Sequence, residues 1–205
     1  MIRHHPADTT LVAYAAGTLA PLHGRVVAVH LTQCAACRAV MAVGEELGGA
    51  VLDTMAPVAL GADALAHTLA RLDLAAPESA QETTAMTLEA LTRGGRWRRV
   101  GPGVRLMKLV PRDATGTRLD LVRVSPGTAL PRHDHRGAEM TCLLKGAFAD
   151  KLGEYHMGDL EEGDVGLDHE PRALDGEECI CIIATTGYLR AHGLFTRMLQ
   201  PLFGI

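Results

Sequence analysis

The sequence has few aromatic residues and no long apolar run. Aromatic side chains make up 3% of its 205 residues, which argues against a surface that stacks nucleic-acid bases. The net charge of −4 would repel a phosphate backbone. No stretch approaches the roughly 18 apolar residues that span a bilayer, and the opening MIRHHPADTT lacks the apolar core of a signal peptide. We therefore expect a cytoplasmic protein with no direct nucleic-acid or membrane partner.

Cysteine is also scarce, and its odd count excludes a fully paired disulfide framework. There are five cysteines. In a reducing compartment, closely spaced cysteines indicate metal binding or redox chemistry more than structural disulfides. Cys179 and Cys181 lack the spacing of a zinc knuckle and face one side of a predicted strand. We interpret them as core thiols, with a redox pair as the alternative.

The first part of the chain is typical of short helices. Asp8 or Thr9 can cap a first helix, and Pro21 can open a second. A third helix is expected to begin near residues 34–37 and to end at residues 48–49, a Gly-Gly pair. Further helices are expected near residues 63–72 and 78–91.

The composition changes at TRGGRW, residues 92–97. Beyond it, prolines and glycines separate stretches of strand length such as VRLMKLV, TRLDLVRV and ECICIIAT, which predict an all-β sandwich or barrel. We therefore predict an α + β protein of two domains. The first is a small helical bundle over residues 1–92, with a linker over about residues 50–77, and the second is an antiparallel β domain over residues 93–205.

Three metal-ligating residue types stand close together in the segment HLTQCAAC. His30 is followed by Cys34 four residues on and by Cys37 three further. On a continuous helix these positions share one face, and they still converge at a helix junction if the chain turns near Cys34. Zinc takes imidazole and thiolate ligands and, in structural sites, four of them. The segment predicts a zinc site whose fourth ligand comes from elsewhere in the helical domain.

Three histidines compete for the fourth position, and we favour His5. His23 lies two helical turns before His30, which places it roughly 10 Å from the cysteines. The segment HHP precedes the first helix and is free to fold back. His5 is preferred to His4 because Pro6 starts the entry to the helix directly after it. Zinc bound in this way would tie three short helices together, which a module with a thin core needs.

This pattern resembles the zinc-binding anti-sigma factor family, whose mark is a distal histidine followed by H-x3-C-x2-C. The matching residues are His5, His30, Cys34 and Cys37. The resemblance implies a helical domain that binds an extracytoplasmic-function sigma factor and prevents it from binding RNA polymerase. In that family the zinc is mainly architectural.

A second set of ligand types lies in GTALPRHDHRGAEMTCLLKG, residues 127–146. In a strand, His133 and His135 point to the same face, and Glu139 can return to that side after Gly137 bends the chain. Two imidazoles and a carboxylate make part of a divalent metal site. Glu139 could instead serve as a general base, but we favour ligation.

A further ligand must come from another strand, and His169 is the candidate. His156 competes, but the segment GEYHMGD is typical of a hairpin tip. The pattern resembles the cupin barrel, whose first motif, G-x5-H-x-H-x3-E-x6-G, is matched at every position. The second motif is matched at its two glycines and its histidine but lacks the proline and the asparagine. The resemblance implies a jelly-roll barrel with four metal ligands: His133, His135, Glu139 and His169.

Ligand type does not choose the metal of the second site. Three histidines and a carboxylate suit zinc, iron, manganese, nickel or copper. We expect a divalent metal in the cupin, zinc before iron, manganese or nickel, and Zn2+ in the N-terminal domain.

A zinc-binding helical module followed by a cupin is the layout of the ChrR-type anti-sigma factors, which the chain resembles along nearly its whole length. That resemblance implies a cytoplasmic one-to-one complex with an extracytoplasmic-function sigma factor through the N-terminal domain. It also implies release of the sigma factor when the cupin senses singlet oxygen or organic peroxides. We predict that the cupin site initiates release and that the N-terminal zinc holds the sigma-binding surface in shape.

Two other functions compete with this reading. Cupins with this ligand set often act as dioxygenases or isomerases, and the zinc module would then be an accessory. Against an enzyme, the barrel segment is short of aromatic residues to line a substrate pocket, and nothing besides the ligands looks like a catalytic pair. A repressor that binds DNA directly conflicts with the negative charge and the absence of a recognition helix.

Overall fold

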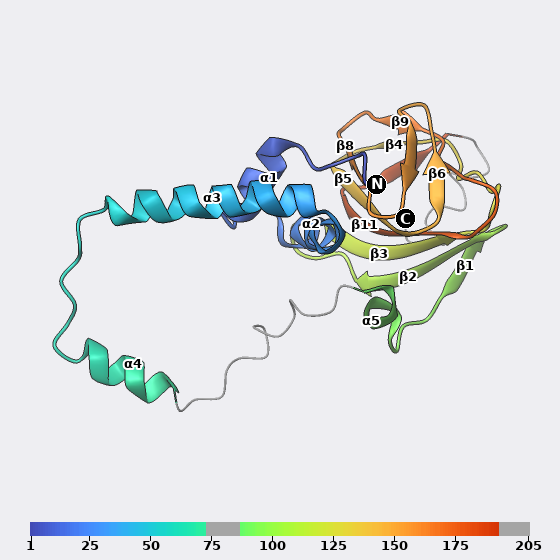
Figure 1. The fold of residues 1–205 in the computed structure, drawn as a ribbon. Helices are drawn as coiled ribbons and strands as arrows, with labels where there is room; N and C mark the ends of the chain where they lie inside the picture. Colours follow the sequence, from blue (N-terminus) through green and yellow to red (C-terminus); the bar gives the residue numbers. More distant parts are fainter. Residues whose placement is uncertain (73–86, 193–205) are drawn as a thin grey trace.

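The structure is a computed structural model that describes residues 1–72 and 87–192. Figure 1 shows a β barrel with the first helices beside it and α3 extending away from it toward α4. The predicted fold class, an α + β chain with a helical part followed by an antiparallel barrel, is confirmed. The helices are α1 Asp8–Ala15, α2 Pro21–Gln33, α3 Ala35–Asp53, α4 Ala64–Leu72 and α5 Leu88–Thr92.

Two helix boundaries differ from the predictions. The residue before α1 is Ala7, which offers no side-chain cap, and Asp8 is already the first helical residue. The expected end of the third helix at the Gly-Gly pair of residues 48–49 is also wrong, because α3 continues to Asp53. Glycine costs a helix only about 1 kcal/mol relative to alanine, and the flanking Leu47 and Ala50 are good helix formers. Of the helix expected over residues 78–91, residues 78–86 lie outside the described residues.

The strands form one large and two small antiparallel sheets. The six-stranded sheet has the order β1-β2-β3-β11-β5-β8, and the small sheets have the orders β10-β6-β7 and β12-β4-β9. Every strand pairing in the described part of the chain is antiparallel, as in a jelly roll. The strands are β1 Arg98–Gly101, β2 Val104–Val110, β3 Thr117–Val124, β4 His133–His135, β5 Glu139–Lys145, β6 Ala147–Ala149, β7 Glu154–His156, β8 Leu160–Gly163, β9 Asp168–His169, β10 Arg172–Ala173, β11 Cys179–Thr186 and β12 Leu189–Ala191.

The large sheet separates two cores. Successive side chains of a strand point to opposite faces. On β5, Met140 and Cys142 pack with the valines of α2, whereas Leu143 packs with Phe148 and Tyr155 inside the barrel. The helical part and the barrel therefore share one hydrophobic core across the outer face of the sheet, and α2 contacts β5, β11 and β3.

Truncation of this shared core is expected to destabilise both parts together. Leu121 is 0% exposed on the face of β3 that belongs to the core shared with α2. The variant Leu121→Ala should lower the free energy of unfolding by about 2–5 kcal/mol. Circular dichroism and intrinsic fluorescence during urea unfolding should report one coincident transition. The exposed variant Val43→Ala on α3 should change the stability by less than about 0.5 kcal/mol. Two separate transitions would contradict a common core.

Within the described residues, no single helix is both long and apolar enough to cross a bilayer. The helices α2 and α3 pass that test of length and composition only as a pair, and the chain bends by 116° at the break between them.

Candidate metal centres

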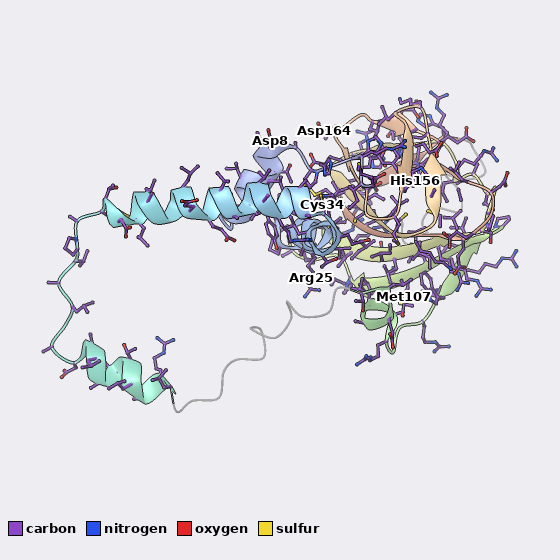
Figure 2. The ribbon with its side chains drawn as sticks, in the orientation of Figure 1. Asp8, Arg25, Cys34, Met107, His156 and Asp164 are labelled. Carbon is purple, nitrogen blue, oxygen red and sulfur yellow. The ribbon has the colours of Figure 1, made fainter. Side chains whose placement is uncertain are left out.

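The N-terminal ligands meet where α2 ends and α3 begins. His30 lies in the last turn of α2, and Cys34 is the residue that joins the two helices, with an extended backbone. The Cys34 sulfur accepts a hydrogen bond from the backbone N–H of Cys37 at 3.4 Å and so caps α3. Figure 2 shows Cys34 at this junction, next to the barrel. The ligands therefore converge because the chain bends at Cys34, the second of the two geometries expected from the sequence.

The first residues of the chain fold back and bring His5 to the same place. Nδ1 of His5 lies 3.3 Å from the sulfurs of both Cys34 and Cys37. Nε2 of His30 lies 3.2 Å from the Cys37 sulfur. One ligand atom from each of the four residues lies within 4.8 Å of all the others. The structure thus brings together the four residues that the sequence predicted.

The donor set and the protonation of this cluster fit zinc. In a tetrahedral site, neighbouring N and S ligands are about 3.6 Å apart, given Zn–N of about 2.0–2.1 Å and Zn–S of about 2.3 Å. Burial, with a hydrogen bond to Cys34, raises the pKa of the Cys37 thiol to about 12. A buried thiolate therefore needs a nearby positive charge, which a bound cation supplies. Burial lowers the pKa of His30, which favours the neutral imidazole that a metal binds.

The two competing histidines of the helical part lie elsewhere. Nε2 of His4 donates to the carbonyl of Glu154 on the barrel, at 3.1 Å. His23 is 4% exposed between α2 and the sheet, where it hydrogen-bonds the backbone of Ala138. Burial lowers the pKa of His23. Neither histidine belongs to the cluster with Cys34, whose other histidines are His5 and His30.

The second cluster lies inside the barrel, across β4, β5 and β9. Nε2 of His169 lies 3.1 Å from Nε2 of His135 and 3.2 Å from Nε2 of His133. Glu139 completes the group, and one ligand atom from each of the four residues lies within 4.8 Å of the others. Gly137 makes this possible, because a Cβ there would lie 2.2 Å from the carbonyl oxygen of Thr186 on the paired strand.

Hydrogen bonds fix which ring nitrogen faces the centre of this cluster. Nδ1 of His133 donates to the carbonyl of Pro131 at 2.8 Å, and Nδ1 of His169 donates to the carboxylate of Asp150 at 2.8 Å. Both rings therefore present the lone pair of Nε2 inward. Lone pairs that face one another at about 3 Å repel, and a cation between them removes that repulsion, so the residues present fit a divalent metal. Such an ion would act as a Lewis acid in a site walled by imidazoles.

The pKa of His169 shifts in the opposite direction to the pKa values of His133 and His135. Burial lowers the pKa of His133 and His135. Burial also works against a charged His169, but its interactions with the carboxylates of Glu161 and Asp150 outweigh burial and raise its pKa. The side chains of both carboxylates are buried beside the ring. They orient His169 and increase its basicity as a ligand.

These supporting carboxylates were missed by the analysis of the sequence. Asp150 comes directly after β6, and Glu161 lies in β8 within an acidic stretch. The sequence of that stretch does not show which of its carboxylates point into the barrel. The inward direction of Glu161 follows from the register of β8 against β5, which pairs it with Thr141. His156 does not join the cluster, because it is exposed on β7, where its Nε2 lies 2.8 Å from Oε1 of Glu154.

The remaining cysteines are buried in the barrel. Cys142 is in the core shared with α2, and Cys179 and Cys181 are in the barrel interior. The sulfurs of Cys179 and Cys181 are 3.6 Å apart, and both cysteines are free thiols. The prediction that all three are core residues is confirmed by their burial.

Comparisons with known proteins agree with this arrangement. A family model described as the ChrR cupin-like domain matches residues 86–189. The anti-sigma-E factor ChrR of Cereibacter sphaeroides (strain ATCC 17023) is 38% identical over 217 residues, which cover 100% of this chain and 99% of that protein. The chain also superposes on a chain of the crystal structure of Rhodobacter sphaeroides SigE in complex with the anti-sigma ChrR. The TM-score is 0.76 and the sequence identity 39%, covering 90% of this chain and 99% of that chain.

Proposed function

Because the chain belongs to the ChrR family of anti-sigma factors, we propose that it sequesters an extracytoplasmic-function sigma factor in a one-to-one complex. The observation that carries the proposal is the identity of 38% with an anti-sigma factor along the whole chain. We assign the binding to a helical domain over residues 1–92 and the sensing to a cupin domain over residues 93–205. The complex would form in the cytoplasm, where RNA polymerase acts.

An exposed apolar stripe on α3 supports this assignment of the binding surface. The stripe has the spacing i, i+3, i+7 and i+11, which places its members on one face of the helix. Each residue is at least 48% exposed, and contiguous exposed apolar residues mark a site of interaction with another protein. A sigma factor that packs against α3 would bury them. The stripe consists of Val40, Val43, Leu47 and Val51.

Exposed leucines on the short helix α4 also support the assignment of the sigma-binding surface to this part of the chain. Leu65, Leu69 and Leu72 recur at i, i+4 and i+7 on α4, and no residue of this helix is buried. Figure 1 shows α4 beyond the end of α3 and away from the barrel. A partner that lies between α3 and α4 would cover both apolar faces at once.

A charge placed on the α3 stripe should weaken sigma binding without unfolding the protein. Leu47 is 63% exposed, so Leu47→Asp should leave the thermal unfolding temperature within about 2 °C of wild type. The affinity for the sigma factor, measured by isothermal titration calorimetry, should fall at least tenfold, about 1.4 kcal/mol. The matched control is Ala42→Asp, which places the same charge on a different exposed face of α3. Equal effects of the two variants would contradict the proposed stripe.

We further propose that the cupin site senses singlet oxygen or organic peroxides. The imidazole rings of His133, His135 and His169 are electron-rich, and singlet oxygen adds directly to such rings as O2 without any further reactant. An oxidised ring no longer donates its Nε2 lone pair, so the four-ligand cluster would lose its geometry. A change of this kind biases a two-state element, here the helical part packed on the other side of the sheet.

The relative that is 38% identical along the whole chain is an anti-sigma factor, a regulator, which favours the anti-sigma function over the enzyme alternative. The decisive experiment is co-expression with the extracytoplasmic-function sigma factors of the same genome, followed by co-purification and metal analysis. We expect one sigma factor per chain and two metal ions, one of them zinc. A chain that purifies without any sigma factor in every co-expression would contradict the proposal.

A further inference from the structure

The turn that joins β7 to β8 touches the N-terminal ligand cluster although it belongs to the barrel. Nδ1 of His30 donates to the carbonyl of Gly158 at 2.7 Å. Because this bond occupies Nδ1, the lone pair of Nε2 faces the Cys37 sulfur. Gly158 has φ +91, and a Cβ there would lie 2.7 Å from Cδ1 of Ile2. The turn therefore approaches the helical part as closely as only glycine allows.

The next residue of the turn holds the segment that carries His5. Oδ1 of Asp159 accepts hydrogen bonds from the backbone N–H of Arg3 at 2.7 Å and of His4 at 3.1 Å. Its Oδ2 accepts from the backbone N–H of His156 at 2.9 Å. Asp159 is 0% exposed. Burial opposes its ionisation, but the backbone donors of His156, His4 and Arg3 outweigh burial, and its pKa lies below the ordinary value.

A backbone hydrogen bond from the first residue of β8 also holds the N-terminal segment against the barrel. The N–H of Leu160 donates to the carbonyl of His4 at 3.1 Å. His4 is thus held at its N–H by Asp159 and at its carbonyl by Leu160, one residue before His5. Two of the four N-terminal ligands, His5 and His30, are positioned by the turn of the barrel.

Glu161, the residue after Leu160, contacts the cupin cluster. Glu161 is 5% exposed and points into the barrel, where its Oε1 lies 3.7 Å from Nδ1 of His169. Leu160 points to the opposite face and packs in the core shared with α2. The alternation of side chains along β8 therefore places the outer contacts of both clusters on four consecutive residues, 158–161.

We propose that Gly158, Asp159 and Glu161 are positioning residues through which metal binding in the cupin tightens metal binding at the N-terminal cluster. The turn is anchored to the barrel by two backbone bonds with Leu143 of β5, so it shifts with the barrel as a unit. Outer hydrogen bonds of metal ligands are worth about 10–100-fold in metal affinity. A displacement at His169 would therefore reach His5 and His30 as a change in affinity. The coupling is reciprocal, because it is a free energy shared by two binding sites.

This proposal rests on the metal sites and deepens the sensing part of the proposed function. Its test uses the full chain without any sigma factor, so its failure and that of the proposed function are distinguishable. The probe is Co2+, whose bond to thiolate gives a charge-transfer absorption that reports only the cluster with Cys34 and Cys37. The d–d absorption of Co2+ bound to nitrogen and oxygen reports the cupin.

The first arm compares the wild type with His133→Ala, a change on the far strand β4 that removes a cupin ligand. The Co2+ affinity of the cysteine site should fall at least fivefold in this variant, the lower end of typical coupling between two sites. The control His67→Ala removes an exposed histidine on α4 and should match the wild type. Equal affinities of the wild type and His133→Ala would overturn the coupling.

The second arm tests the turn itself with Asp159→Asn, which keeps the shape but loses the charge and one acceptor. Release of Co2+ from the cysteine site to excess EDTA should become at least tenfold faster. The control Glu162→Gln alters an exposed bond to the N–H of Ala7 and should change this rate by less than twofold. Glu161→Gln should accelerate release at least threefold, although it touches no N-terminal residue. Unchanged rates in Asp159→Asn or in Glu161→Gln would overturn the role of that residue. If circular dichroism shows Asp159→Asn unfolded, the first arm decides.

Discussion

Replacement of Cys34 by serine is expected to remove one zinc ion per chain and to abolish capture of the sigma factor. Structural zinc sites of small modules bind with apparent free energies of about 10–16 kcal/mol, and that free energy is part of folding. Here the cluster joins α2, α3 and the first residues of the chain. The apolar core of this part is small, and it lies mostly between α2 and the sheet. Without zinc, α3 should lose its fixed direction and the apolar stripe its position.

Three measurements check this result. Metal analysis of purified Cys34→Ser should show one zinc ion fewer than wild type. Calorimetry should show an affinity for the sigma factor at least about 100-fold weaker, about 2.8 kcal/mol. Sensitivity of the α2–α3 junction to limited proteolysis should rise. The control is Cys142→Ala, which removes a buried thiol that lies in the shared core and outside both ligand clusters. If Cys34→Ser held the sigma factor as tightly as Cys142→Ala, the zinc would not shape the binding surface.

Replacement of Glu139 by glutamine should have the opposite phenotype, with the sigma factor held and not released. Glutamine has the shape of glutamate and can accept the hydrogen bond that Thr185 donates to Glu139 at 3.1 Å. A neutral amide is a poor ligand for a divalent cation, and loss of a ligand should cost at least the roughly 10–100-fold that outer partners are worth. The helical part keeps its own ligands, so affinity for the sigma factor should stay within about threefold of wild type, about 0.7 kcal/mol.

The readout is the rate at which the sigma factor leaves the complex under a photosensitiser that generates singlet oxygen. We expect release from Glu139→Gln to be at least tenfold slower than from wild type, with one metal ion per chain retained at the N-terminal cluster. His156→Ala, an exposed histidine on β7, serves as the control and should release normally. Normal release from Glu139→Gln would place the sensor outside the cupin metal site.

The eight candidate ligands could be proposed from the sequence because most of them are close to one another along the chain. His30, Cys34 and Cys37 lie within eight residues around the bend between α2 and α3, and His133 and His135 lie on one strand. Local geometry alone brings such residues together. The two distant ligands, His5 and His169, were chosen by reach and by resemblance to a motif.

The supporting contacts could not be predicted in the same way. The bond between His30 and Gly158 joins residues 128 apart in sequence, and that between Arg3 and Asp159 joins residues 156 apart. No local pattern specifies such pairs, because they depend on how α2 packs on the sheet. His23 shows the same limit. Its distance along α2 was enough to disfavour it as a ligand, but its burial against the backbone of Ala138 could not be predicted from the sequence.

The continuation of α3 through the Gly-Gly pair of residues 48–49 has a different cause. The Gly-Gly pair carries only a local preference for a helix end, and a helix ends where the neighbouring residues also stop favouring it. Residues 50–53 after the pair are Ala, Val, Leu and Asp, and three of them continue the apolar pattern. Intrinsic preference at two positions was outweighed by the rest of the window.

The core shared by α2 and the outer face of the sheet limits how this protein could be rebuilt. Sensors with new inputs are often made by joining an output module from one protein to a receptor module from another. Here the junction is a packed surface rather than a tether, because Val26, Val27 and Val29 are buried against residues of β5 and β11. A transplanted barrel would need matching side chains on its outside as well as its own ligands inside. A substitution on one of the two packed surfaces therefore restricts which side chains the other can carry.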